Sequence, residues 1–198
     1  MALFLCNNPS PTPSDILLSK FDFTKDTDYL VDEVNPQKTV SITSGITHDS
    51  NGLFFPSSGN YAIDLSSYNY VFSNFTKVYA EIDFGEINIP SNPTSNVRFI
   101  MYDSTYGLIY RGGSSNNYWA VYNNNTWLPS SGDTDVNTFS NSTLKIICDN
   151  DLKFYKNDAL FYTVANFLKT NPSFNISSSG NYSLHNAYVK GFRLYAKQ

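Results

Sequence analysis

The chain ends in a strand-like segment, Tyr188–Tyr195, which constrains the possible folds more than any other part of the sequence. Two of its apolar residues, Val189 and Phe192, are three positions apart rather than two. Because alternate residues of a strand face opposite sides, a bulge at Lys190-Gly191 is needed to bring both to one core face. An earlier apolar run, Leu17–Phe23, has the character of a partner strand. The two segments predict a β-sandwich whose first and last strands lie side by side.

The composition also favours strands. The 198 residues include 15 Tyr and 15 Phe, while charged residues make up only 15%. Aromatic side chains suit half-buried pleated surfaces, and the abundant Asn and Ser suit turns. We therefore expect an all-β fold, an antiparallel two-sheet β-sandwich of the jelly-roll kind. A chain of this length is typical of one such domain, so we expect an extended arm at residues 1–14 and a single sandwich at residues 15–198.

Alternating apolar residues mark the individual strands. Lys77–Phe84 alternates cleanly between apolar and polar positions. The turn sequence Asp149-Asn150-Asp151 joins Leu144–Cys148 to Leu152–Tyr155 and predicts a hairpin. Further strands are expected at Thr39–Thr43, Leu53–Phe55, Tyr61–Leu65, Asn96–Tyr102, Gly107–Arg111, Tyr118–Tyr122 and Ala159–Tyr162.

Charge and hydropathy exclude several classes of partner. The net charge is -4 and the Lys and Arg residues are scattered, so no nucleic-acid partner is expected. A single-jelly-roll coat protein of a small RNA virus is disfavoured for the same reason, because a basic arm would have to neutralise the packaged RNA. No apolar run is long enough to span a membrane. The first residues lack the basic start of a secretory signal, so we expect a product made without an export signal.

The residues that could hold metal are few. Cys6 and Cys148 fit no metal-binding spacing, and a disulfide between them is left open. We expect no cofactor. Calcium is the one alternative, because four acidic residues could supply oxygen ligands although their spacing matches no defined loop. These are Asp22, Asp26, Asp28 and Asp32.

The order of the strand-like segments resembles that of a known superfamily. The segments are Leu17–Phe23, Gly52–Phe55, Gly59–Leu65, Lys77–Phe84 and the closing segment. Their order resembles the concanavalin A-like, laminin-G-type sandwich superfamily. The resemblance implies two antiparallel sheets packed face to face, often with a face that binds glycans. It also implies that a member can be a carbohydrate-binding or adhesive module without catalysis.

One motif suggests an enzyme instead. Glu81-Ile82-Asp83-Phe84-Gly85-Glu86 is similar to the signature of the laminarinase and lichenase group of glycoside hydrolases. That resemblance implies that Glu81 is the nucleophile, Asp83 the assisting carboxylate and Glu86 the acid/base of a retaining mechanism. The sequence departs from the signature at Gly85, where the group has an apolar residue. We keep this activity as the alternative.

A second stretch offers the residue types that bind sugars. Aromatic faces stack on the apolar faces of sugar rings, while amide and guanidinium groups bond to hydroxyls. The competing interpretation is that an aromatic ring here fills the core. The candidate glycan-binding residues are Tyr110, Arg111, Asn117, Tyr118, Trp119 and Trp127.

Together these features predict a non-catalytic structural or adhesive surface protein on a bacteriophage particle, as a capsid decoration, head fibre or tail component that binds host glycans. A phage protein leaves the cell by lysis and needs no export signal, so the expected location is the virion surface. The alternative location is the cytoplasm. The apolar arm would dock on other virion or surface proteins within an oligomer or larger assembly, through Leu3, Phe4 and Leu5.

The docking role of the arm can be tested by deletion. A version of the protein that lacks residues 1–14 is expected to fold but not to enter particles. Particle composition measured by mass spectrometry checks this expectation. Incorporation equal to that of the full chain would contradict the role of the arm.

Overall fold

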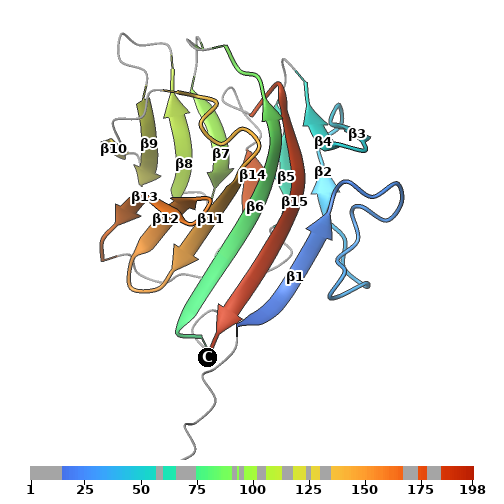
Figure 1. Cartoon of the computed structure of the whole chain (residues 1–198), viewed down its shortest axis with the longest axis horizontal. Coiled ribbons are helices and arrows are strands. Elements are labelled where there is room, and N and C mark those ends of the chain that lie inside the picture. The colour runs from blue at the N-terminus through green and yellow to red at the C-terminus, as the bar shows by residue number, and fades with distance from the viewer. Residues whose placement is uncertain are drawn as a thin grey trace, which may run out of the picture.

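Two long antiparallel strands, β6 (Lys77–Ile87) and β15 (Ala187–Lys197), lie side by side through the middle of the molecule (Figure 1). One edge of β15 pairs with β6, and the other pairs with β1 (Ile16–Asp22) and β4 (Gly52–Phe55). The other edge of β6 pairs with β11 (Thr143–Cys148). The predicted adjacency of the first and last strands is therefore confirmed.

The strands form two antiparallel sheets. The computed structural model describes residues 15–56, 60–65, 75–90, 93, 96–101, 106–112, 118–123, 126–129, 135–166, 174–177 and 184–198, and the side chains of residues 101, 106, 123 and 126–129 fall outside this description. Within these residues the eight-stranded sheet has the order β13-β12-β11-β6-β15-β4-β3, with β1 beside β15. Its further members are β3 (Thr47–Asp49), β12 (Leu152–Lys156) and β13 (Ala159–Val164).

The second sheet has seven strands in the described part of the chain, in the order β10-β9-β8-β7-β14-β5-β2. The predicted all-β, two-sheet antiparallel sandwich is confirmed. The members of this sheet are β2 (Ser41–Ile42), β5 (Ala62–Asp64), β7 (Val97–Met101), β8 (Tyr106–Arg111), β9 (Tyr118–Asn123), β10 (Thr126–Pro129) and β14 (Asn175–Ser177).

Aromatic rings from both sheets meet in the core. Phe84 of β6 lies edge-on to Phe99 of β7, with ring centroids 5.8 Å apart. Phe99 in turn contacts Trp119 of β9 at 4.6 Å. The indole nitrogen of Trp119 donates to the carbonyl of Asp135 at 2.9 Å, so burial of this ring leaves no donor unpaired. Much of the aromatic content of the sequence is thus used to join the two sheets.

Two bulges interrupt the pairing of β6 with β15. Val189 pairs with Phe84 and Gly191 with Asp83, so Lys190 is an extra residue in β15. This bulge is the one that the spacing of Val189 and Phe192 predicted, and both residues are buried. Nearby, the register also shifts in β6 around Gly85. Each bulge reverses which alternate residues of its strand face outward.

The outer edge of β1 is covered by a loop that a buried carboxylate holds in place. Asp32 is 0% exposed and accepts hydrogen bonds from the hydroxyl of Ser19 at 2.9 Å and the amides of Lys20 and Val34 at 3.0 and 2.9 Å. A covered edge cannot pair with another chain. Asp32 therefore serves the fold, and no group of three or more acidic, His or Cys residues that could hold a metal ion is present among the described residues.

No helix in the described part of the chain is long and apolar enough to cross a membrane. Cys148 lies buried at the end of β11. Its possible disulfide partner, Cys6, lies outside the described residues, so that pairing stays a prediction.

Candidate functional site

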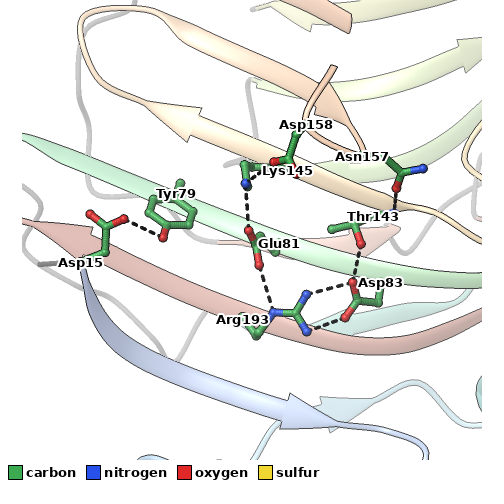
Figure 2. A network of polar contacts seen from close by, with 9 residues as sticks. All are labelled: Asp15, Tyr79, Glu81, Asp83, Thr143, Lys145, Asn157, Asp158 and Arg193. Atoms are coloured by element: carbon green, nitrogen blue, oxygen red, sulfur yellow. Dashed lines mark hydrogen bonds and ion pairs between the residues drawn. The ribbon is translucent and has the colours of Figure 1, made fainter. Parts of the chain in front are cut away.

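The outward face of β6 and β15 carries a row of alternating charges that crosses three strands and a turn (Figure 2). Asp158, in the turn after β12, binds Lys145 of β11 at 2.6 Å. Lys145 also binds Glu81 of β6 at 3.2 Å, and Glu81 binds Arg193 of β15 at 3.0 Å. Arg193 then binds Asp83 at 2.6 Å. We call these five residues the ionic network.

The ionic network occupies the carboxylate oxygens of Glu81 and Asp83 on β6. Oε1 of Glu81 faces Lys145 and Oε2 faces Arg193. Oδ1 of Asp83 accepts from Arg193 at 2.9 Å and from the hydroxyl of Thr143 at 2.7 Å. Burial works to lower the pKa of Arg193, but the hydrogen bond and charge of Asp83, together with Glu81, outweigh it and raise that pKa. Each of the three carboxylates of the network thus lies within 3.2 Å of one of its two cations, Lys145 and Arg193. The network lines a recess of about 290 Å³.

A second recess, of about 300 Å³, lies at the other end of the same two strands. Tyr188 of β15 and Phe54 of β4 are direct cross-strand partners, so their side chains share one face. Their ring centroids are 4.8 Å apart with an angle of 41° between the rings. We call this the aromatic recess; it is lined by Phe54, Glu86, Asn88, Asn186 and Tyr188.

The glycine of the β6 bulge makes room for this arrangement. A Cβ at Gly85 would lie 2.8 Å from the Cβ of Tyr188 and 3.1 Å from Cε of Lys190. Because real Cβ atoms do not approach that closely, a larger residue would displace Tyr188. The carbonyl of Gly85 accepts from the amide of Asn141 at 2.8 Å, which fixes the bulge from its other side. The departure of this position from the hydrolase signature therefore serves to seat an aromatic ring.

Three polar side chains of the aromatic recess are open to a ligand. Among the residues that the structure describes, none forms a hydrogen bond or ion pair with the side chains of Glu86, Asn88 or Asn186. Tyr188 differs, because its hydroxyl donates to Asp49 at 2.9 Å. That hydrogen bond, followed by burial and by the negative charges of Asp49 and Glu86, raises the pKa of Tyr188. The ring thus stays neutral at physiological pH beside one free carboxylate and two free amides.

The three carboxylates of the hydrolase-like motif do not share one cleft. Glu81 lines the recess beside the ionic network, whereas Glu86 lines the aromatic recess. A retaining glycosidase places its two carboxyl groups about 5–5.5 Å apart around one glycosidic bond. Asp83 is held by Arg193 and Thr143. Only Glu86 of the three has carboxylate oxygens that no described residue occupies.

The predicted glycan-binding residues are only partly together at the surface. Tyr110 and Trp119 are both 0% exposed and pack edge to face at 5.5 Å, so the expectation that their rings contact sugar is wrong. Arg111 and Tyr118 lie together, with Nη1 of Arg111 donating to the Tyr118 hydroxyl at 2.6 Å. The remaining residues, or their side chains, lie outside the described part: Leu3, Phe4, Leu5, Asn117 and Trp127.

Sequence reasoning missed four of the five residues that line the aromatic recess. One signal was present for the rings: Phe54 stands between the buried residues Leu53 and Phe55, where alternation predicts a polar side chain. Tyr188 likewise occupies an outward position of the closing strand. An aromatic ring at an outward position exposes apolar surface to water, so it is a candidate for contact with a ligand.

No protein-family model and no curated protein sequence matches the chain. Solved structures do share its fold. Domain 4 of AbnA, an extracellular arabinanase from Geobacillus stearothermophilus solved in complex with arabinotriose, superposes with a TM-score of 0.57 at 15% identity, covering 92% of this chain and 93% of that domain. The carbohydrate recognition domain of Emp47p gives a TM-score of 0.54 at 11% identity, covering 90% and 94%.

A sialidase from Trypanosoma rangeli is also similar, with a TM-score of 0.61 at 13% identity. Here 90% of this chain matches only 30% of the sialidase, so the likeness is to one part of that enzyme. The chain thus shares its β-sandwich fold with a carbohydrate recognition domain and with parts of an arabinanase and a sialidase.

The ionic network predicts an unequal cost for two charge deletions. Arg193→Met is expected to lower the free energy of unfolding by about 2 kcal/mol, because Asp83 loses its cation and Glu81 keeps only Lys145. Lys153→Met is the control: its side chain is 26% exposed, against 27% for Arg193, but it pairs only within a hairpin turn. Denaturant unfolding at pH 7 measures both. Equal losses would show that the network adds nothing beyond a surface ion pair.

Proposed function

We propose that this protein is a non-catalytic glycan-binding β-sandwich that holds carbohydrate in the aromatic recess. One observation carries the proposal: two neighbouring rings, Phe54 and Tyr188, border a recess whose carboxylate and amide groups have no partner among the described residues. These polar groups are solvated by water, so they can exchange that water for the hydroxyls of a ligand that packs against the two rings.

The chemistry of the recess suits a sugar. The C–H groups of a sugar ring form an apolar face that packs on an aromatic ring, and its hydroxyls project from the rim. A carboxylate accepts hydrogen bonds from hydroxyls, whereas an amide both donates and accepts. Glu86 supplies the first kind of group, and Asn88 and Asn186 supply the second. A backbone hydrogen bond holds these two residues together, since the main-chain N–H of Asn88 donates to the main-chain carbonyl of Asn186 at 2.8 Å.

The comparisons support this proposal at the level of the fold. A domain solved with arabinotriose and a carbohydrate recognition domain both have this sandwich over nearly their whole length. A fold hosts many functions, so the recess rather than the likeness is the main argument. The location on a phage particle, the adhesive role there and the docking of the arm at residues 1–14 stay predictions from the sequence.

The proposal predicts that glycan binding depends on one ring. Tyr188→Ala is expected to weaken binding of the glycans captured on an oligosaccharide array by at least about tenfold, equivalent to ~1.4 kcal/mol, because a stacking surface is lost. Tyr155→Ala is the matched control, since Tyr155 is a half-buried tyrosine of the same sheet on β12, away from the recess. Titration calorimetry with the captured glycans measures the affinities. Equal binding by both variants would contradict the assignment of the recess.

The glycoside hydrolase is the second candidate, since the bulge of β6 turns Glu86 to the same outward face as Glu81 and Asp83. Incubation with β-glucans followed by a reducing-sugar assay separates the two functions. The binding proposal predicts no release by the native protein. Release that is lost in Glu81→Gln would establish the enzyme and contradict a purely binding role.

A further inference from the structure

The aromatic recess carries a negative charge with no positive charge among its described lining residues. Glu86 is its one charged lining residue at neutral pH, since Tyr188 donates its proton in a hydrogen bond to Asp49. A second carboxylate, that of Asp49, therefore lies at the hydroxyl end of the ring. A lysine, Lys190, lies next to the bulge, where its carbon chain packs at Gly85. Lys190 is not among the residues that line the recess.

The aromatic recess differs from the ionic network on the same face in how its carboxylate is paired. In the ionic network every carboxylate is matched by Lys145 or Arg193 at 3.2 Å or less. In the aromatic recess the carboxylate of Glu86 has no such partner among the described residues. A carboxylate accepts hydrogen bonds and donates none, so a ligand that satisfies it must bring hydroxyl donors.

We infer that the aromatic recess selects uncharged glycans and rejects acidic ones, with Glu86 as the specificity-determining residue. The inference rests on the proposed function and deepens it by naming the ligand class. An uncharged sugar offers neighbouring hydroxyls that donate to the Glu86 carboxylate. A uronic or sialic acid brings a second carboxylate into a recess that has no lining cation to compensate, so the two negative charges repel each other at close range.

The direction of selection follows from the site rather than from the protein as a whole. The net charge is only -4, and at physiological salt such charges are screened beyond about 8 Å. Glu86 is exposed to solvent, but a ligand carboxylate in contact with it would lie well within that screening length, so the two charges still repel. We therefore expect at least a tenfold difference in dissociation constant between an uncharged glycan and its acidic counterpart.

The test uses pairs of oligosaccharides that differ mainly in charge. One such pair is α-1,4-galactotriose and α-1,4-trigalacturonate. An array of neutral and acidic oligosaccharides of equal length extends the comparison. The full-length native protein is expected to bind the neutral members, and to bind each acidic counterpart at least tenfold more weakly.

Substitution then assigns the selection to one residue. Glu86→Gln keeps the size of the side chain and one acceptor but removes its charge, so it is expected to raise the affinity for the acidic members and narrow the difference to threefold or less. Asp26→Asn changes the net charge equally at an exposed position outside the recess, and it is expected to leave the difference intact. Circular dichroism confirms that both variants are folded.

The possible failures are distinct. If the native protein binds neutral and acidic members equally, or if Glu86→Gln leaves the preference unchanged, the inference is wrong although the glycan-binding function stands. Binding to no member of either set overturns the proposed function, and the inference with it. Narrowing of the preference by Asp26→Asn to the same degree as by Glu86→Gln would show a general charge effect and contradict the role of Glu86.

Discussion

The antiparallel pairing of β6 with β15 is the constraint on which the rest of the structure depends. These strands are joined from Lys77 opposite Lys197 to Ile87 opposite Ala187. Strands β1 and β4 add to the far edge of β15, and β11 adds to that of β6. Strand pairing of this kind, between segments far apart in the chain, brings the conformational cost of a long closed loop. The buried faces of both strands, together with the aromatic cluster around Phe84, offset that cost.

The exposed face of the same two strands carries paired charges in one region and unpaired polar groups beside aromatic rings in another. At one end, the ionic network pairs its charges internally and ties the turn at Asp158 to the centre of the sheet. At the other end, Phe54 and Tyr188 stand beside polar groups that no described residue satisfies. Groups of the first kind are tied to one another, whereas Glu86 and Asn88 are exposed to water and remain available to a ligand. This contrast is the physical reason for placing function at the aromatic recess.

Residue patterns predicted the features that depend on local alternation. Val189 and Phe192 were enough to predict the bulge in β15, because their spacing fits no regular strand. The strands β3, β10 and β14 are only three or four residues long, so they contain too little alternation to be recognised. In the strands that carry Tyr110 and Trp119, apolar residues face both sides, so alternation cannot say which aromatic ring turns inward. Neither does the sequence reveal that Tyr188 pairs with Phe54, since that depends on long-range register.

The paired bulges have a consequence for how this surface tolerates changes in chain length. Before the bulge in β6 the odd-numbered Glu81 and Asp83 face solvent, and after it the even-numbered Glu86 does. In β15 the even-numbered Tyr188 faces outward before the bulge and the odd-numbered Arg193 after it. Each inserted residue thus shifts the in–out alternation of its strand by one position, which keeps the polar residues of both strands on one continuous face. Deleting Gly85 would remove the bulge yet leave Glu86 outward and Ile87 inward, whereas deleting a residue from a regular stretch of the strand would exchange its neighbours between water and core, so this surface tolerates a lost residue only at the bulge itself.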